Sequence, residues 1–389
     1  MSIRILQLGL NVNSKSGGLF SSVMNFNEAL VANGCMVDIC SVNTSCAACD
    51  SVRNLPSSWG AIGRRYRLVK HADRSELERR LEASDLLFFH GMFSGAFDTL
   101  AQRARRRGIP YIVVPHGTLD PWVFTYRRWR KLLWWHVRGG RFVRNASAVV
   151  YATASERAKA QSRWSLVNGV VINWPVSNFA AIPVPESARS HWASLLGNRR
   201  IAVLAGRLQR VKRVLDTANA FLAAAPDDWK LCVVGPKEDP AIAARLESLC
   251  HRFPEKIAYY GMVDRSELRS LLSLASLSVL FSHKENFGYA AAEALACGVP
   301  VAVSESVGLC ADIARARAGV VWDERSELAG FLRDLLAVPP AELAVMGERG
   351  RVFAGASLTF SAFSSGLEAL CRKVVNAASE ARITAGNAA

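Results

Sequence analysis

Short apolar runs rich in β-branched residues alternate with segments of helical character along most of the chain. Alternation of this kind is typical of βαβ units, in which parallel strands form a sheet and helices cover both of its faces. The runs form two series, at 3–10, 37–42, 85–90, 111–117, 147–153 and 169–173, and then at 200–208, 230–236, 256–261, 277–282, 299–305 and 318–323. The sequence therefore predicts an α/β protein built from two tandem Rossmann-like domains that face each other across a cleft.

The segment between the two series differs from them in composition and in hydrophobic pattern. Residues 173–200 contain three prolines and no long periodic pattern, which indicates a linker. The last residues of the chain are small and polar, as in a chain end that frays. We expect an N-terminal domain at 1–178, a linker at 179–199, a C-terminal domain at 200–365, and a C-terminal helix with a frayed tail at 366–389.

The composition fits a folded protein whose charge is unevenly distributed. A hydrophobic share of 50% over 389 residues is ample for sizeable cores and excludes a disordered chain. Residues 1–180 hold 24 basic and 11 acidic side chains, whereas the remainder holds 24 and 22. The basic excess of the first half is either a solvated basic face or a sign of a polyanionic neighbour, such as an anionic membrane surface, a nucleic acid or a phosphorylated ligand.

The cysteines and the apolar runs favour a cytoplasmic protein. Several of the nine cysteines lie inside apolar runs, a usage that suits a reducing compartment. Cys46 and Cys49 have the spacing of a redox or zinc pair, but no second pair follows, so we expect no metal site. Residues 1–13 are interrupted by polar side chains and predict a first strand rather than a signal peptide. No apolar run approaches the roughly 18 residues that would span a bilayer.

Ligands of open α/β sheets bind beyond the carboxyl ends of the strands. In the first half, Gly17 and Gly18 follow the first strand and precede a helix, where a glycine backbone can approach a phosphate closely; an ordinary glycine turn is the alternative. His116 directly follows a strand and has Asp120 close by. A histidine there can exchange a proton near neutral pH, hold a hydroxyl group, or be structural.

Two cations follow the first strand of the second half. Arg207 comes just after the strand and Lys212 stands near the start of the next helix. A guanidinium and an ammonium at a helix N-terminus together form a site for a diphosphate, although either residue alone could be a surface cation.

Glu285 and Glu293 stand eight positions apart, one in a loop and the other in the following helix. Eight helical residues would separate them by about 12 Å along the helix axis. Retaining glycosidases need about 5 Å between their two carboxyl groups, so an acid/base pair is disfavoured, although the wider spacing of inverting enzymes stays an alternative. We expect each glutamate to accept hydrogen bonds from its own pair of hydroxyls, one pair on a sugar and the other on a ribose.

These residues resemble the family-4 retaining glycosyltransferases of the GT-B fold. The resemblance covers most of the chain and is strongest from 200 to 322. It rests on "GRLQRVK", "VVGP", "YYGMVDRSEL", "ENFGYAAAEALACGVPVAVS" and the terminal "MGERGRVFAGASLTFSAFSSGLEALC". It implies an N-terminal domain on the acceptor side and a C-terminal domain that binds a nucleotide sugar.

The resemblance also implies a role for each matching residue around the leaving group. Gly18 would approach the donor diphosphate, while Arg207 and Lys212 would neutralise it. Val263 would lie against the base through its backbone, and His116 matches the family's N-domain histidine near the reacting carbon.

Further roles implied by the resemblance concern the two sugar rings of the donor. Glu285 would contact hydroxyls of the donor sugar, and Glu293 would bind the ribose. The backbone amides of Asn286, Phe287 and Gly288 would line the sugar and the phosphate. The family implies no metal and no cofactor beyond the nucleotide-diphosphate sugar, and a front-side displacement in which the leaving phosphate helps to take the acceptor proton.

The sequence departs from the family pattern at two places. Arg213 stands where the family often has a glycine, and this change could add a phosphate contact or alter the donor. Asn173-Trp174-Pro175 stands where many members have Pro-Asn-Gly, and this change bears on the hinge between the domains.

Residues 124–144 interleave basic and aromatic side chains. Such a segment suits an interfacial helix on anionic lipid, although an amphipathic core helix is an alternative. Single-stranded nucleic acid is a weaker alternative, because no RNP, KH or helix-turn-helix signature accompanies the segment, and we expect no nucleic-acid partner. The residues of this expected membrane or acceptor face are Arg127, Arg128, Trp129, Arg130, Lys131, Trp134 and Trp135.

Together with the basic segment, this resemblance implies a retaining glycosyltransferase on the inner face of the cell membrane. It would move a sugar from a nucleotide-diphosphate donor to a saccharide or polyprenyl-linked acceptor in the synthesis of a surface polysaccharide, such as lipopolysaccharide or exopolysaccharide, or of a glycolipid. The alternatives are a nucleotide-sugar epimerase on the same fold and a non-catalytic protein that binds nucleotides or an anionic surface.

Overall fold

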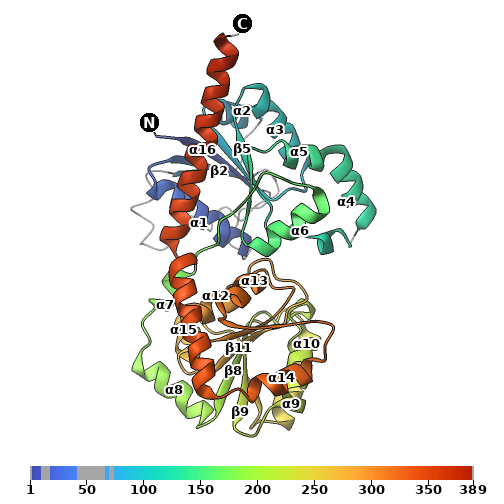
Figure 1. Cartoon of the computed structure of the whole chain (residues 1–389), viewed down its shortest axis with the longest axis vertical. Helices are drawn as coiled ribbons and strands as arrows, with labels where there is room; N and C mark the ends of the chain where they lie inside the picture. Colours follow the sequence, from blue (N-terminus) through green and yellow to red (C-terminus); the bar gives the residue numbers. More distant parts are fainter. Residues whose placement is uncertain (1, 10–17, 42–65, 70–73, 126, 388–389) are drawn as a thin grey trace. The chain divides into compact units, whose positions relative to one another are not determined.

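The computed structural model describes residues 2–9, 18–41, 66–69, 74–125 and 127–387 (Figure 1). The chain forms two compact units. The first comprises Met1–Trp174 together with Ser361–Ala389, and the second is the continuous stretch Pro175–Phe360. Each unit contains a parallel sheet covered by helices, which confirms the prediction of two Rossmann-like domains.

The described part of the first unit contains a seven-stranded parallel sheet in the order β3-β2-β1-β4-β5-β6-β7. Its strands are β1 (Arg4–Gly9), β2 (Met36–Ser41), β3 (Tyr66–Val69), β4 (Leu86–His90), β5 (Tyr111–Val114), β6 (Ala148–Tyr151) and β7 (Gly169–Val171). Its helices are α1 (Gly18–Ala32), α2 (Arg74–Glu82), α3 (Gly95–Arg106), the 3₁₀ helix η4 (Pro121–Phe124), α4 (Arg128–Trp134), the π-helix η5 (Trp135–Gly139), α5 (Gly140–Arg144), α6 (Ala154–Trp164) and most of α16 (Phe360–Asn387).

The described part of the second unit contains a six-stranded parallel sheet in the order β10-β9-β8-β11-β12-β13. Its strands are β8 (Arg200–Ala205), β9 (Trp229–Val234), β10 (Ile257–Tyr259), β11 (Leu277–Leu280), β12 (Val301–Ser304) and β13 (Gly319–Trp322). Its helices are α7 (Ser177–Ala180), α8 (Glu186–Leu196), the 3₁₀ helix η6 (Arg210–Lys212), α9 (Val214–Ala224), α10 (Pro240–Arg252), α11 (Arg265–Leu272), α12 (Tyr289–Ala296), α13 (Cys310–Ala316), α14 (Leu328–Leu336) and α15 (Pro340–Ser357).

The central strands of both sheets are buried on both faces. Every residue of β4, β5, β6, β9, β11 and β12 is buried. Strands covered by helices on both sides need continuous apolar runs, which explains why all twelve runs of the sequence correspond to strands.

The predicted linker at 179–199 differs from the structure, because this range holds α8. Trp192 and Leu196 of α8 are buried, and the Trp192 ring contacts Tyr260 of the second unit at 4.9 Å between ring centroids. The prolines that suggested a linker precede the helix, with Pro185 at its N-cap. A proline just before a helix is compatible with the helix that follows.

The predicted frayed tail also differs from the structure. Helix α16 continues to Asn387 and packs on the first unit, where it lies beside α1 (Figure 1). The Phe363 ring contacts Phe26 of α1 at 5.0 Å, and Arg382 donates a hydrogen bond of 2.6 Å to the backbone oxygen of Gly108. The chain therefore crosses between the units twice, after Trp174 and after Phe360.

Candidate active site

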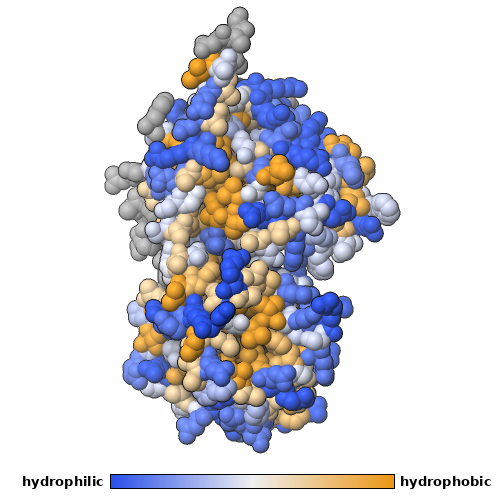
Figure 2. All heavy atoms as spheres, in the orientation of Figure 1, coloured by the Kyte–Doolittle hydropathy of each residue, from blue (hydrophilic) through white to orange (hydrophobic). Residues whose placement is uncertain are grey.

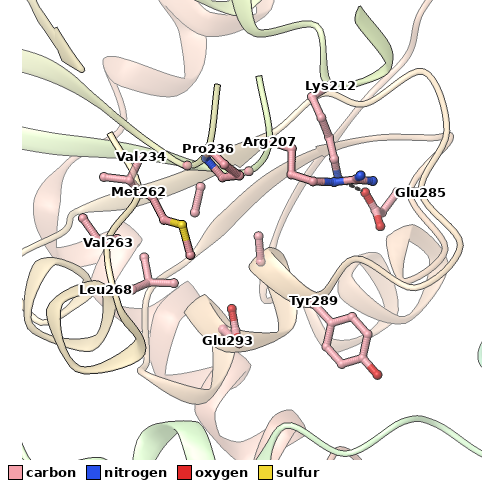
Figure 3. A pocket seen from close by; sticks show the side chains of 14 residues that line it. Arg207, Lys212, Val234, Pro236, Met262, Val263, Leu268, Glu285, Tyr289 and Glu293 are labelled. Carbon is pink, nitrogen blue, oxygen red and sulfur yellow. Dashed lines mark hydrogen bonds and ion pairs between the residues drawn. The ribbon is translucent and has the colours of Figure 1, made fainter. Parts of the chain in front are cut away.

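A pocket of about 300 Å³ opens at the carboxyl edge of the second sheet (Figure 3). Two cations and two glutamates line it together with apolar side chains. The lining residues are Ala205, Gly206, Arg207, Lys212, Val234, Gly235, Pro236, Met262, Val263, Leu268, Glu285, Tyr289, Ala290 and Glu293. The structure thus brings five of the predicted donor-site residues into one pocket of the second unit, namely Arg207, Lys212, Val263, Glu285 and Glu293.

The floor of the pocket depends on two glycines that follow neighbouring strands. Gly206 follows β8 and Gly235 follows β9. A Cβ atom on Gly235 would lie 1.9 Å from the backbone oxygen of Gly206, and Gly235 has φ of +143°. Only glycine permits this approach of the two chain segments.

The two predicted cations lie at the same side of the pocket (Figure 3). Lys212 forms an ion pair with Glu285, and both side chains are largely buried. Arg207 is more exposed and directs Nη1 to both carboxylate oxygens of Glu238, at 3.1 Å each. An incoming polyanion would therefore find both cations at the pocket, each already held by one carboxylate.

Glu285 belongs to the loop between β11 and α12. Its backbone pairs with the segment around Val307, since its N–H donates to Ser306 at 3.2 Å and its carbonyl accepts from Gly308 at 2.8 Å. A Cβ atom on Gly308 would lie 2.0 Å from the backbone oxygen of Asn286. Close packing of the two segments therefore fixes the Glu285 backbone.

The turn that follows Glu285, whose amides we expect along the donor, leads into α12. Asn286, Phe287 and Gly288 are absent from the described residues that line the pocket. Phe287 is buried with its ring 5.0 Å from the Tyr289 ring, and Gly288 takes φ of +101° to begin α12. This turn therefore positions the start of α12, whose first residue, Tyr289, does line the pocket.

Glu293 lies on α12, one turn beyond Tyr289, and its carboxyl group is largely buried. Burial raises the pKa of Glu293 to about 7, against a smaller opposing effect of Arg265, whose Nη2 is 4.0 Å from Oε1. The two glutamates thus come from different elements and have different surroundings.

Arg213, for which the sequence left open a phosphate contact or an effect on the donor, has several side-chain partners of its own. Its backbone has φ of +49°, the left-handed conformation that glycine adopts most readily. Its side chain pairs with Glu324, donates a 2.9 Å hydrogen bond to His283 and lies 5.0 Å from the Trp322 ring. Arg213 is therefore held by its own set of partners and does not line the pocket.

His116 belongs to the first unit and is only partly exposed. Its backbone has φ of +50°, and the next residue, Gly117, donates a 2.7 Å hydrogen bond to the buried carboxylate of Glu156. Burial lowers the pKa of His116 to about 3. The ring is therefore neutral at pH 7, which fits a hydrogen-bonding group better than the expected exchange of a proton near neutral pH.

Among the remaining candidates of the first unit, the structure describes Gly18, Asn173 and Trp174. Gly18 is the first residue of α1, whereas Gly17 lies outside the described residues, as do Cys46 and Cys49. Asn173 donates a 2.9 Å hydrogen bond to Ala152, and Trp174 ends the first unit with its ring 5.4 Å from that of His116.

The basic segment divides between surface and core. Trp135 is buried against Trp164, at 4.2 Å between ring centroids, so its assignment to an outer face is wrong. Trp134 is half-buried against Phe93, and Lys131 donates a 2.6 Å hydrogen bond to Val123. Trp135 follows the half-buried Lys131 and Leu132 by four and three residues, so all three lie on the inner face of the helix.

The outer side of the same segment is apolar and basic. Trp129, Leu133 and Val137 are 79%, 65% and 59% exposed. Arg127, Arg128 and Arg130 are also exposed. Figure 2 shows apolar and hydrophilic atoms side by side at the edge that α4 occupies in Figure 1.

None of the helices in the described ranges combines the length and apolar character needed to cross a membrane. Within the same ranges, histidine, cysteine and carboxylate side chains form no cluster of three or more that could bind a metal ion.

Comparison with known proteins identifies two family models along the chain. The model described as Glycosyltransferase Family 4 matches residues 16–175, and the model described as Glycosyl transferases group 1 matches residues 187–353. The two matches together cover most of both units.

Curated relatives match parts of the chain. D-inositol 3-phosphate glycosyltransferase of Xylanimonas cellulosilytica is 32% identical over 45% of this chain and 42% of its own length. GDP-mannose-dependent alpha-(1-6)-phosphatidylinositol dimannoside mannosyltransferase of Mycobacterium tuberculosis is 30% identical over 62% of this chain and 63% of its own length. The chain thus spans less than two thirds of the length of these relatives.

Solved structures share the fold over almost the whole chain. Sucrose-phosphate synthase of Thermosynechococcus elongatus has a TM-score of 0.73 at 21% identity and covers 96% of this chain and 100% of its own. HepE of Anabaena in complex with UDP has a TM-score of 0.74 at 16% identity, over 95% of this chain and 100% of its own. WaaG, a glycosyltransferase involved in lipopolysaccharide biosynthesis, has a TM-score of 0.65 at 15% identity, over 94% and 99%. The protein therefore belongs to the family-4 glycosyltransferases and has the GT-B fold.

Proposed function

We propose that the protein transfers a glycosyl group from a nucleoside-diphosphate sugar to a saccharide or polyprenyl-linked acceptor, with retention of configuration. The observation that carries the proposal is the pocket of the second unit, where Arg207, Lys212, Glu285 and Glu293 line one cavity at the carboxyl edge of a parallel sheet. Complexes of Anabaena HepE with UDP and with UDP-glucose support a donor of this class.

The two cations would bind the diphosphate. Lys212 is paired with a single carboxylate in the ligand-free chain, and a diphosphate carries more negative charge than one carboxylate. The ammonium would therefore move toward the diphosphate, and the released carboxylate of Glu285 would accept hydrogen bonds from hydroxyls of the donor sugar. Glu293 would accept the ribose hydroxyls, with the base against the backbone of Val263.

The reaction would be a front-side displacement at the anomeric carbon. The bond between this carbon and the diphosphate oxygen breaks, and the electron pair stays on the diphosphate. The acceptor oxygen forms the new bond on the same face, and its proton passes to the departing phosphate. Arg207 and Lys212 would stabilise the charge that develops on the leaving group, with no metal or other cofactor assigned to the step.

The acceptor would be presented at the inner face of the cell membrane, in the synthesis of a surface polysaccharide or glycolipid. Residues 121–155 contain seven lysines and arginines and no aspartate or glutamate. The exposed Trp129, Leu133 and Val137 lie among these cations. Apolar side chains within a basic surface are suited to insertion between anionic headgroups.

A transfer assay tests the proposed reaction. The full chain is incubated with a panel of nucleoside-diphosphate sugars, with and without saccharide and polyprenyl-linked acceptors, and both the released nucleoside diphosphate and the glycosylated product are measured. We expect acceptor-dependent transfer, reduced more than nucleotide binding by Glu285→Gln. Glu293→Gln should instead weaken nucleotide binding more. Interconversion of the donor sugar without an acceptor, or tight nucleotide binding without turnover, would contradict the proposal.

Vesicle co-sedimentation tests the membrane surface separately. We expect the full chain to bind anionic vesicles and not neutral ones, and the double variant Arg128→Gln/Arg130→Gln to bind less. The matched control Arg245→Gln/Arg333→Gln removes two exposed cations from the second unit and should leave binding unchanged. An equal loss of vesicle binding in both double variants, or equal binding of the full chain to anionic and neutral vesicles, would contradict a membrane-binding role of this segment.

A further inference from the structure

Three polar side chains form a continuous chain at the carboxyl edge of the first sheet, where β1, β4 and β5 are neighbours. Gln7 lies in β1, His90 ends β4, and His116 follows β5 by two residues. Gln7 Oε1 is 2.9 Å from His90 Nε2, and His90 Nδ1 is 3.0 Å from His116 Nε2. The two imidazole rings are also stacked, with centroids 5.3 Å apart.

The inner part of this chain is fully buried. Gln7 and His90 are 0% and 1% exposed, and the His90 ring packs against Phe26 and Phe88 at 5.2 and 6.3 Å. Polar side chains in such apolar surroundings destabilise a protein unless their hydrogen bonds are made. His116 is the member of the chain that reaches the surface, so the buried pair can act on the outside only through it.

The Gln7 amide is oriented with Oε1 toward His90, which leaves its buried Nε2 without a partner among the described residues, and the positions of the ring protons follow from this orientation. The carboxamide oxygen of Gln7 can only accept, so His90 Nε2 must donate. Burial lowers the pKa of His90 well below its ordinary value, so the ring is neutral and its Nδ1 can only accept. His116 Nε2 must then donate to His90, which leaves the other nitrogen of the neutral His116 ring, Nδ1, as an acceptor.

The remaining acceptor has no partner. His116 Nδ1 is buried and makes no hydrogen bond within the described part of the chain. A buried polar atom without a partner calls for an explanation, and a bound ligand is one of them. The backbone around this atom is also held, since Gly117 is hydrogen-bonded to Glu156.

We propose that Gln7 and His90 are positioning residues that hold His116 in its Nε2–H tautomer, so that Nδ1 accepts a hydrogen bond from a hydroxyl of a saccharide ligand. The identity of the hydroxyl donor rests on the proposed function, whereas the tautomer does not. His116 then acts as a neutral acceptor that selects and orients a hydroxyl group.

Nuclear magnetic resonance of the full chain, labelled with ¹⁵N in its histidine rings, tests the tautomer directly. Long-range ¹⁵N–¹H correlations distinguish a protonated ring nitrogen from an unprotonated one, and His116→Ala assigns the His116 signals. We expect Nε2 protonated and Nδ1 unprotonated in both His90 and His116 at pH 7. A proton on Nδ1 of His116, which would follow if the Gln7 amide had the opposite orientation, would overturn the proposal.

A pair of variants separates positioning from packing. Gln7→Leu removes the acceptor, so we expect mixed tautomers at His90 and His116. Transfer should fall about tenfold, the effect of one lost hydrogen bond, with unchanged nucleotide affinity. Phe88→Leu alters the packing beside His90 without removing a hydrogen bond, and should keep the wild-type tautomers. Similar spectra for the two variants would show a packing effect and contradict the positioning role of Gln7 and His90.

The measurements also separate this proposal from the proposed function. The spectrum of the ligand-free chain reports the tautomer whether or not transfer is detected. Nucleotide affinity, measured by calorimetry with a nucleoside diphosphate, reports the pocket of the second unit. Transfer in Gln7→Leu equal to wild type, with the wild-type tautomer lost, would refute the positioning role and leave the proposed function standing.

Discussion

Lys212 and Arg213 are adjacent cations that the backbone directs to different partners. Lys212 ends η6 and lines the pocket beside Glu285. Arg213 takes the left-handed conformation, and its side chain joins Glu324 and Trp322 instead. Charge and spacing in the sequence could not separate their roles, because they do not show which partners each side chain contacts in the folded chain.

Glu293 gives a prediction for the pH dependence of stability. Burial raises its pKa from 4.5 to about 7 in the folded chain, so between these values the folded state keeps a proton that the unfolded state has lost. Stability then falls as the pH rises through this window and is lowest above it. We expect Glu293→Gln to stabilise the protein at pH 8, by at most about 3 kcal/mol, and to have less effect at pH 5.

Urea denaturation at pH 5 and pH 8 measures this difference. The quantity that tests the prediction is the change in the free energy of unfolding between variant and wild type, since other groups titrate in both. Glu238→Gln, which removes a more exposed carboxylate that pairs with Arg207, serves as the control. A stabilisation by Glu293→Gln that is the same at both pH values would refute the assignment.

Site residues that lie close together in the sequence were easier to predict than site residues that only the order of the strands brings together. The turn with Arg207 and Lys212 and the loop and helix with Glu285 and Glu293 follow strands that the apolar pattern locates. Gln7 and His90 were missed as partners of His116, because only the order of the strands in the sheet brings positions 7, 90 and 116 together.

At the scale of elements, the buried parallel strands were predictable from the sequence, whereas the edge strand β3 and the helix α8 were not. Strand β3 was missed because "YRLV" lies among basic residues and forms the edge of its sheet, where burial imposes no apolar run. Helix α8 was read as a linker because prolines precede it. Apolar periodicity therefore locates buried elements and gives little information about edge elements.

The contact between the turns after β8 and β9 gives a prediction at this scale. A side chain on Gly235 would collide with the backbone of Gly206, whereas one on Gly261 would meet open space; both have positive φ. We expect Gly235→Ala to destabilise the protein by about 3 kcal/mol, from the clash and the backbone strain together. Gly261→Ala should cost only the strain, about 1 kcal/mol.

Thermal or urea unfolding of the two alanine variants provides the measurement. Gly235→Ala should also weaken nucleoside diphosphate binding, because Gly235 lines the pocket. Equal destabilisation by the two substitutions would show that the close approach of the turns contributes nothing.

At the scale of the whole molecule, the second unit is continuous and the first is not. Residues 361–389 return to the first unit, where Phe363, Leu367 and Cys371 are buried. The sequence indicated a terminal helix but not the unit to which it belongs, because an amphipathic helix does not specify the face that covers it.

Because the second unit is one continuous stretch of chain, we expect it to fold without the rest of the protein. We expect residues 175–360 alone to fold cooperatively and to bind a nucleoside diphosphate with an affinity close to that of the full chain. Residues 1–174 alone lack α16 and should be unstable until residues 361–389 are joined to them. Circular dichroism and calorimetry check both fragments, and a fragment 175–360 that folds without binding the nucleotide would contradict the placement of the whole pocket in this unit.

The central claim is that the second unit binds a nucleoside diphosphate through Lys212. Calorimetric titration of the full chain with nucleoside diphosphates tests it most directly, with wild type, Lys212→Met and Arg213→Met compared side by side. We predict that wild type and Arg213→Met bind the same nucleotide similarly and that Lys212→Met binds it at least about tenfold more weakly. Equal affinities in all three proteins, or no binding of any nucleoside diphosphate by wild type, would contradict the claim.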